Sequence, residues 1–257
     1  MLVILSPAKK LDLTPREVPF PLEAPQFQKE AITLAQEARA LGPQGLRRLM
    51  KISDALAELN HDRFLAFAPE PDASQVHPAL HAFAGDTYTG LAAHSLSPDA
   101  LEWARAHLRI LSGLYGLLRP FDAMQPYRLE MGSRLQTSRG KTLYEYWGTR
   151  IAAAVNEAVA AAGSTALVNC ASQEYFGAVQ RDALTCRVVT PVFLDQRDVE
   201  APKVISFHAK KARGAMARFI LEHRLTDPDT LTEFDTDGYR HAPELSQKDR
   251  PAFLRQS

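Results

Sequence analysis

The stretch from Leu111 to Gly132 (LSGLYGLLRPFDAMQPYRLEMG) limits what this 257-residue chain can fold into more than any other part of the sequence. Its first part is apolar, yet it contains Gly113 and Gly116. Glycine weakens a regular element, so two glycines in an apolar run indicate tight turns or places where another backbone approaches closely. We therefore expect a stiff, non-helical segment that packs closely against the rest of the chain.

Two arginines in this stretch lie beside prolines. Arg119 directly precedes one proline and Arg128 closely follows another, and proline disfavours helix on both sides. Asp122 and Glu130 are near enough in sequence to orient the two guanidinium groups through two-pronged hydrogen bonds. The pattern permits two interpretations, a buried loop with structural ion pairs or the rigid wall of an anion-binding cleft.

The composition is that of an ordinary globular protein, with 46% hydrophobic and 23% charged residues. No apolar run approaches the roughly 20 residues that a membrane-spanning helix needs. Met1 leads directly into an apolar run, without the basic segment of a secretory signal. Cys170 and Cys186 are too few for a disulfide framework. We expect a cytoplasmic protein without a membrane partner.

Nothing in the sequence indicates a cofactor or a metal site. Gly85–Gly90 (GDTYTG) lacks the glycine spacing of a phosphate loop or a dinucleotide fingerprint, and we expect it to form a compact polar turn. His77 and His81 are four residues apart but have no obvious third ligand nearby. We therefore predict no cofactor and no bound metal.

The charges are balanced overall but unevenly distributed. The formal net charge is zero, which counts against a nucleic-acid-binding protein. However, the segments 105–150 and 201–225 are rich in lysine and arginine, whereas 226–244 is acidic. The chain would present a positive face if folding brought the two basic segments together.

Two predicted strands lead into polar segments. Met1–Leu5 is expected to be a buried strand, and Lys9 and Lys10 follow its end. Ala166–Cys170 is a second short apolar strand, and the passage that leaves it contains Asn169, Ser172, Glu174 and Tyr175. In α/β proteins, such positions after a buried strand commonly bind ligands. Cys170 lacks a partner histidine and is expected to be a buried, unreactive thiol.

Helical spacing of apolar residues predicts helices over Gln26–Leu41 and Leu46–Leu59. The break between them, from Gly42 to Gly45, resembles the turn of a helix-hairpin-helix, in which turn amides meet a phosphate. Arg47 lies at the start of the second helix. An ordinary packed helical hairpin remains the alternative interpretation.

Three further predictions concern the second half of the chain. Lys141–Ala162 is expected to be one long helix, and Lys203–His208 a strand. A helix over Ala209–His223 would carry Lys210, Lys211 and Arg213 in its first turn, where the helix dipole disfavours positive charge and an anion nearby would compensate. The residues after Pro243 are expected to form a frayed tail.

Several motifs occur together and in order: SPAKKLD at residues 6–12, GDTYTGL at 85–91, the stretch 111–132, NCASQEYF at 169–176, PVF at 191–193 and KKARGAMARF at 210–219. Together they closely resemble the YaaA family of bacterial peroxide-stress proteins. The resemblance extends from Met1 to about Tyr239. It gives a YaaA-like domain at residues 1–240, followed by a C-terminal tail at 241–257.

The resemblance implies a single-domain mixed α/β protein with an unusual fold, in which helices surround a mixed sheet. It also implies a positively charged cleft, a helix-hairpin-helix element, binding to duplex and branched DNA, induction by hydrogen peroxide, and protection of DNA by limiting damage from unincorporated iron. It carries no established catalytic residues. The resulting DNA-binding candidates are Lys9, Lys10, Gly42, Gly45, Arg47, Arg119, Arg128, Lys210, Lys211 and Arg213.

The leading hypothesis is therefore a non-catalytic DNA-binding protein that acts mainly through phosphate contacts. It requires Arg128 and Lys211 to line opposite sides of one groove. The alternative is an enzyme that acts on a nucleotide or a small anionic substrate, because residue types suited to proton transfer and oxyanion stabilisation cluster at turns and strand ends. Its candidate residues are Asp86, Glu130, Asn169, Ser172, Glu174 and Tyr175. Direct iron sequestration has no support from the scattered histidines.

Overall fold

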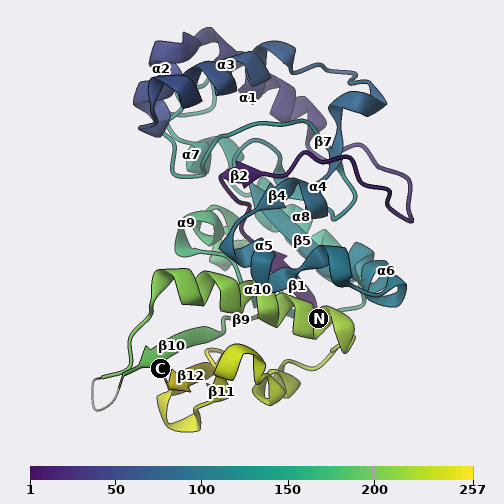
Figure 1. The fold of residues 1–257 in the computed structure, drawn as a ribbon, viewed down its shortest axis with the longest axis vertical. Helices are drawn as coiled ribbons and strands as arrows, with labels where there is room; N and C mark the ends of the chain where they lie inside the picture. The colour runs from purple at the N-terminus through teal and green to yellow at the C-terminus, as the bar shows by residue number, and fades with distance from the viewer. Residues whose placement is uncertain (198–200, 257) are drawn as a thin grey trace.

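A five-stranded sheet lies at the centre of the computed structural model, which describes residues 1–197 and 201–256 (Figure 1). The strand order is β6-β5-β1-β8-β9; β1 pairs in parallel with β5 and β8, β8 pairs in parallel with β9, and only β6 is antiparallel. The predicted mixed α/β class is confirmed. The strands are β1 (Leu2–Leu5), β5 (Leu108–Ser112), β6 (Gly116–Leu118), β8 (Ala166–Asn169) and β9 (Arg187–Val189).

The central strands are buried on both faces. Every residue of β1 and β8 is buried, and Val3 lies opposite Leu108 on one side and Val168 on the other. Continuous apolar runs are typical of parallel strands that helices cover on both sides. The strands predicted at Met1–Leu5 and Ala166–Cys170 are therefore confirmed, with ends one residue shorter.

Helices α5 (Asp86–Leu91) and α10 (Ser206–Glu222) cover the face of the sheet that is turned toward the viewer in Figure 1. They cross with their backbones in contact, because each has a glycine at the crossing. A Cβ atom on Gly214 would lie 1.7 Å from the carbonyl oxygen of Thr87, and one on Gly90 would lie 2.0 Å from that of Lys211. These contacts fix the first turn of α5 next to the third turn of α10, and the end of α5 next to the second turn of α10.

The stretch 111–132 is the buried segment that its sequence predicts. Residues 111–118 form a hairpin of β5 and β6 with no exposed residue. Gly113 allows the close approach of another backbone, since a Cβ there would lie 2.2 Å from the carbonyl oxygen of Leu129. Gly116 adopts a positive φ of 66° at the turn, and Trp147 donates its indole N–H to the Gly113 carbonyl at 3.1 Å.

A helical layer at the top of Figure 1 contains α1 (Gln28–Ala40), α2 (Gly42–Met50) and α3 (Asp54–Ala66). The helix predicted at Gln26–Leu41 is confirmed, but the break after it is a single residue. Gly42 and Gly45 belong to the beginning of α2, so they do not form the predicted hairpin turn. The helix predicted at Leu46–Leu59 is divided, because Ser53 caps a new helix by accepting a hydrogen bond from the Leu56 N–H.

Three other element predictions are wrong. The long helix predicted at Lys141–Ala162 is two helices, α7 (Leu143–Trp147) and α8 (Arg150–Ala161), separated at Gly148 with φ 51°. The turn predicted at Gly85–Gly90 is mostly helix α5. The strand predicted at Lys203–His208 gives way to α10, which begins at Ser206 and so places Lys210 and Lys211 beyond its first turn. The helix dipole therefore gives no reason for an anion at these lysines.

The residues after Pro243 are ordered, in contrast to the predicted frayed tail. They include β12, which lies between β10 and β11 in a second sheet, parallel to β10 and antiparallel to β11. Phe253 of β12 is fully buried. The remaining elements are β2 (Lys10–Leu11), β3 (His77–Pro78), α4 (Ala79–Ala82), β4 (Phe83–Ala84), α6 (Pro98–His107), β7 (Ala123–Met124), α9 (Gln173–Phe176), β10 (Val192–Gln196), β11 (Arg240–His241) and β12 (Ala252–Gln256).

The crossing of α5 and α10 predicts a large effect of a single methyl group. Gly214→Ala should destabilise the protein by about 2 kcal/mol or more, because the new Cβ forces the two backbones apart. Gly177→Ala is the matched control, since its Cβ would be 3.5 Å from the nearest atom, on the Tyr144 ring. Urea unfolding followed by circular dichroism measures both, and equal midpoints for the two variants would contradict the proposed contact.

Candidate functional site

A pocket of about 370 Å³ lies beyond the carboxyl ends of β1 and β8. We call it the strand-end pocket; it is lined by residues 6–10, 84–87 and 170, 172, 174 and 175, together with Glu130, Lys210 and Arg213. The chain connects β1 onward to one half of the sheet and β8 to the other half. Neighbouring parallel strands whose connections diverge in this way leave a crevice, which is where open α/β sheets usually bind ligands.

Hydrogen bonds between the two strand exits hold the floor of this pocket together. The Ser172 N–H donates to Ser6 Oγ at 2.8 Å, and the Ser6 hydroxyl donates to Ser172 Oγ at 3.3 Å. Tyr88 of α5 donates its hydroxyl to the Ser6 carbonyl at 3.0 Å. Asn169 does not line the pocket; it lies next to the lining residue Cys170, and its side-chain oxygen accepts the Ala171 N–H at 3.0 Å. The exits of β1 and β8 are thus fixed to each other and to α5.

The pocket contains both signs of charge, and two of its three carboxylates, Glu130 and Glu174, have hydrogen-bond partners, whereas Asp86 forms no ion pair with a described residue. Glu130 Oε1 accepts both prongs of the Arg128 guanidinium, at 2.9 and 3.1 Å, and lies 3.4 Å from Lys9 Nζ. Its other oxygen, Oε2, is buried and has no hydrogen-bond partner. Glu174 Oε1 accepts the backbone N–H of Gly132 at 2.9 Å.

Several cations of the pocket have no such partner. Lys10, Lys210 and Arg213 form no ion pair with a carboxylate of the described residues. Arg213 is half-buried, and this burial lowers the pKa of its guanidinium. A guanidinium removed from water without an anion loses solvation and gains nothing in return, so this side of the pocket favours a negatively charged ligand.

Two buried residues of the pocket lining, Cys170 and Tyr175, are unreactive. Cys170 is almost fully buried, and burial raises the pKa of its thiol to about 12, so that little thiolate exists at neutral pH. The expectation of a buried, inert thiol is confirmed. Tyr175 is also buried, and burial raises the pKa of its hydroxyl far above the usual value, so the group stays protonated.

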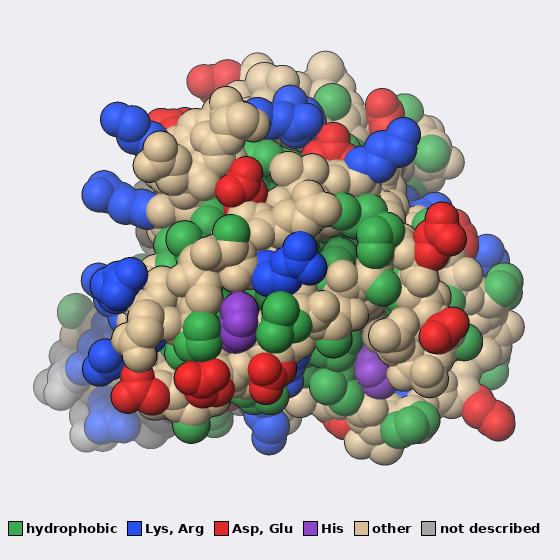
Figure 2. Space-filling view, turned by 90° about the horizontal axis from the view of Figure 1, so that it is seen from above, with side chains coloured by type: hydrophobic (Ala, Val, Ile, Leu, Met, Phe, Trp, Pro, Cys, Tyr) green, Lys and Arg blue, Asp and Glu red, His purple; other side chains and the backbone are tan. Residues whose placement is uncertain are grey.

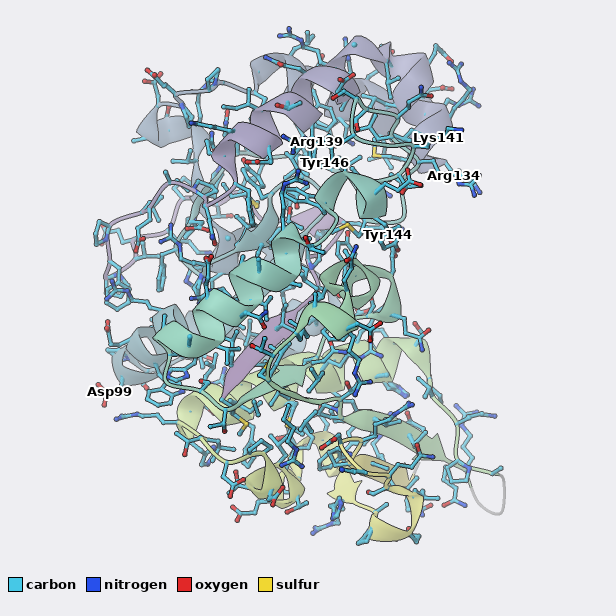
Figure 3. The ribbon with its side chains drawn as sticks, turned by 180° about the vertical axis from the view of Figure 1, so that it is seen from behind. Asp99, Arg134, Arg139, Lys141, Tyr144 and Tyr146 are labelled. Carbon is cyan, nitrogen blue, oxygen red and sulfur yellow. The ribbon has the colours of Figure 1, made fainter. Side chains whose placement is uncertain are left out.

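A second hollow of about 550 Å³ lies beside α2 and is lined by Leu41, Gly45, Arg48, Leu49, Lys51, Gly132, Arg134, Leu135 and Gln136. We call it the α2 hollow. Its three cations are exposed and have no carboxylate partner among the described residues. Lys and Arg side chains gather along the edge of the molecule where α2 lies (Figure 2), and Arg134 and Lys141 point outward at this edge (Figure 3). Gly132 connects the two hollows, since its N–H binds Glu174 of the strand-end pocket.

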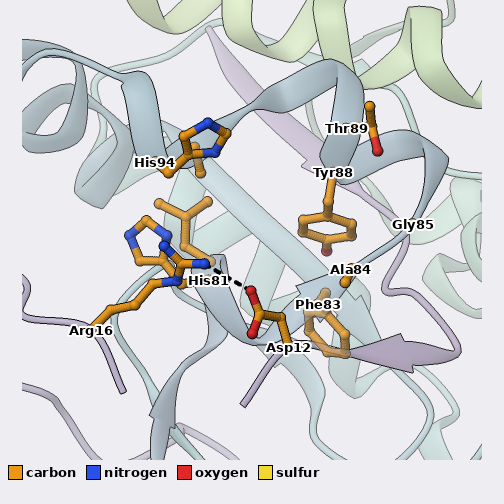
Figure 4. Close-up of a pocket in the computed structure, with 11 residues that line it drawn as sticks. Asp12, Arg16, His81, Phe83, Ala84, Gly85, Tyr88, Thr89 and His94 are labelled. Carbon is orange, nitrogen blue, oxygen red and sulfur yellow. Dashed lines mark hydrogen bonds and ion pairs between the residues drawn. The ribbon is translucent and has the colours of Figure 1, made fainter. Parts of the chain in front are cut away.

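A third pocket, of about 340 Å³, adjoins the strand-end pocket and shares Ala84 and Gly85 with it (Figure 4). Asp12 and Arg16 form an ion pair at 2.7 Å on one side, beside His81. Burial and the nearby Arg16 lower the pKa of His81.

The described residues contain no group of three or more His, Cys, Asp or Glu side chains arranged to hold a metal ion. No helix in the described part of the chain is long and apolar enough to span a bilayer.

The structure brings many of the predicted site residues together. Asp86, Glu130, Ser172, Glu174 and Tyr175 line the strand-end pocket together with Lys9, Lys10, Lys210 and Arg213. These nine residues come from five separate stretches of the sequence. Ser6 and Arg134 were not among the predicted residues. The available signals are that Ser6 directly follows β1 and opens the motif SPAKKLD, and that Arg134 comes two residues after the stretch 111–132.

Other predicted DNA contacts are engaged in ion pairs. Arg119 binds Asp122 and Glu23, and Arg128 binds Glu130, as the spacing of the two carboxylates in the stretch 111–132 predicts. Lys211 lies 2.9 Å from Asp237, and Arg47 lies 3.0 Å from Asp54. Neither Arg128 nor Lys211 lines the strand-end pocket, so this pocket is not the groove that the two residues were expected to flank.

Comparison with known proteins agrees with the motifs. The family model described as Peroxide stress protein YaaA matches residues 1–245. A UPF0246 protein of Roseobacter denitrificans is 57% identical over 256 residues, which are 99% of this chain and 98% of that protein. UPF0246 proteins of Ruegeria pomeroyi and Dinoroseobacter shibae are each 56% identical over 99% of this chain and over 98% and 95% of their own lengths. The similarity thus continues beyond Tyr239, the limit of the resemblance expected from the sequence.

The ion pair of Arg119 predicts a pH-dependent effect on stability. Asp122 is fully buried, and burial raises the pKa of its carboxyl group to about 6, above the 3.8 of a free aspartate, although Arg119 opposes the shift. Because the folded pKa exceeds the unfolded one, the ionised carboxylate weakens the fold above pH 6 and protonation relieves this cost. Arg119→Gln should therefore cost about 3 kcal/mol at pH 8 and clearly less at pH 5.

Arg47→Gln is the control, since its ion pair with Asp54 is exposed and should contribute less than about 1 kcal/mol at either pH. Chemical unfolding at the two pH values measures all three proteins. A loss in Arg119→Gln that does not depend on pH would show that the Asp122 carboxylate is not the group responsible.

Proposed function

The chain belongs to the family of the peroxide stress protein YaaA, and we propose that it acts in the peroxide stress response by binding duplex and branched DNA. By covering DNA, it would limit iron-dependent oxidative damage. The observation that supports this proposal is the set of exposed, unpaired cations around the α2 hollow.

Free cations are the groups that matter for DNA binding. Release of counterions from phosphates drives nonspecific binding, and a cation already paired with a carboxylate contributes little to it. Arg48 and Lys51 reach the α2 hollow from the C-terminal end of α2, and Arg134 reaches it from the segment after Gly132. Lys141 adds a further exposed cation at the same edge (Figure 3). Four cations from separate segments suit a phosphate backbone that passes over this edge.

The residues that line the α2 hollow also suit contact with the sugar-phosphate backbone of DNA. Its floor contains Leu41, Leu49 and Leu135, and no carboxylate is among its lining residues. No aromatic side chain lines it either, so stacking of unpaired bases is not part of the proposed mode. Contacts to phosphates alone carry no sequence information, and binding should therefore be largely independent of sequence.

The alternative function, an enzyme that acts on a nucleotide or a small anionic substrate, has one observation in its favour. The strand-end pocket combines Glu130 and Glu174 with Lys210 and Arg213 in a space of ligand size. Carboxylates near cations in a pocket are the groups that general acid–base chemistry uses. Turnover of a nucleotide that is lost in Glu174→Gln would establish this function.

The DNA proposal predicts a change in the salt dependence of binding. The double variant Arg48→Gln/Arg134→Gln should bind a fluorescent 30-base-pair duplex about 10–100-fold more weakly near 0.1 M salt. The slope of log affinity against log salt should become less steep by about 2, one for each lost phosphate contact. Fluorescence anisotropy at several salt concentrations measures both quantities, with a four-way junction as a second probe.

Arg181→Gln/Arg240→Gln is the matched control for charge, because both arginines are exposed and lie outside both hollows. It lowers the net charge by the same amount and should leave the slope nearly unchanged. Equal slopes for the two double variants would rule out the α2 hollow as the DNA contact.

A further inference from the structure

The strand-end pocket differs from the α2 hollow in both lining and charge. Cys170 and Tyr175, which are buried, belong to its lining, and its sides come from two strand exits, α5 and α10. Its volume of about 370 Å³ is within the roughly 300–1,000 Å³ that small-molecule sites occupy. A pocket of this volume beside buried groups accommodates a terminal group more readily than a backbone that continues in both directions.

The cations of the pocket lie on two sides of it. Lys210 and Arg213 are three residues apart on α10 and therefore share one face of that helix. Lys10 comes from the exit of β1, and none of these three forms an ion pair with a described carboxylate. Lys9 is 68% exposed and has only the 3.4 Å contact with Glu130. A ligand with two negative charges would satisfy more of these groups than a singly charged one.

Arg213 is the most informative of these groups. Its helix is held in place by the contact of Gly214 with α5, so the guanidinium approaches the pocket from a fixed backbone. An arginine side chain presents a planar fork that matches two oxygens of a phosphate. The described residues supply no carboxylate for this fork, and a partly desolvated guanidinium without an anion is costly.

The carboxylates of the pocket require hydrogen-bond donors from a ligand, whereas its cations require negative charge. Glu130 is paired with Arg128 and Glu174 accepts the Gly132 N–H, and neither of them, nor Asp86, forms an ion pair with Arg213. Glu130 Oε2 still lacks a donor. A ligand that carries hydroxyl or amino donors next to its phosphate would fit both parts of the pocket, and a nucleotide has this combination.

We propose that the strand-end pocket binds the terminal phosphomonoester of a nucleotide, with Arg213 and Lys210 on the phosphate. Two sources share this chemistry, a free nucleoside monophosphate and the phosphorylated end of a DNA strand. The site is separate from the α2 hollow, and it goes beyond duplex binding because it requires a terminal phosphate.

The test measures binding to the full-length protein by calorimetry and by thermal unfolding. The probes are dAMP, deoxyadenosine, inorganic phosphate, and a 12-nucleotide DNA strand with either a 5′-phosphate or a 5′-hydroxyl. At about a 100-fold excess over its Kd, dAMP should raise the melting temperature by about 5–10 °C. Deoxyadenosine, which lacks the phosphate, should have no effect.

The variants separate the pocket from the rest of the protein. Arg213→Gln should weaken binding of dAMP by about 10–100-fold, the usual effect of losing a charge-assisted hydrogen bond. Because Arg213 is half-buried, Lys210→Gln is a second variant, whose exposed side chain can be changed without disturbing the core. It should weaken binding about threefold or more with an unchanged melting temperature of the free protein. Arg240→Gln is the control and should bind as the wild type does.

The two sources are distinguished by the DNA strands. A preference for the 5′-phosphorylated strand over the 5′-hydroxyl strand assigns the pocket to DNA ends, whereas strong binding of dAMP without this preference assigns it to free nucleotides. If no probe shows a dependence on phosphate, or if Arg213→Gln and Lys210→Gln both bind dAMP like the wild type, the proposal is wrong. The double variant Arg48→Gln/Arg134→Gln should retain binding of dAMP, so failure of the pocket and failure of the duplex proposal give different results.

Discussion

The close contact between α5 and α10 at Gly90 and Gly214 is the constraint on which the site depends. It lets the backbones of two helices touch over the same face of the sheet, next to the ends of β1 and β8. Without it, Lys210 and Arg213 would lie farther from the strand exits. The hydrogen bond from Tyr88 of α5 to the Ser6 carbonyl then connects this helix pair to the floor of the pocket. Two glycines, each against the backbone of the other helix, thus determine where the charged residues meet.

Sequence patterns predicted the elements that are defined locally. The buried strands β1 and β8 follow from continuous apolar runs, and the ion pairs of Arg119 and Arg128 follow from the spacing of nearby carboxylates. The errors occurred where a local preference was decided by distant contacts. Lys203–His208 has the composition of a strand, but the chain begins α10 at Ser206, where the helix packs on α5.

The C-terminal residues show the same limitation. The short polar segment after Pro243 has no local signal for order. It is ordered because β12 pairs with both β10 and β11 and buries Phe253. Likewise, the residues of the strand-end pocket could be predicted individually, because most of them follow buried strands or lie in short polar segments. The sequence could not predict which cations would remain free, because Asp237 pairs with Lys211 and Glu23 pairs with Arg119 from distant parts of the chain.

The distinction between paired and free cations changes what a neutral net charge means for this protein. Many of its arginines and lysines neutralise a neighbouring carboxylate, as Lys211 does with Asp237, and these contribute to stability more than to binding. Among the described residues, three cations without an ion pair line each of two hollows that are joined through Gly132. The exposed hollow offers charges to any passing phosphate backbone, so its contribution depends on salt. The strand-end pocket holds the half-buried Arg213 on a fixed helix beside buried groups, where salt screens its charge less than that of the exposed lysines. The two sites therefore suit different tasks, affinity for the DNA backbone at one and selection of a chemical group at the other.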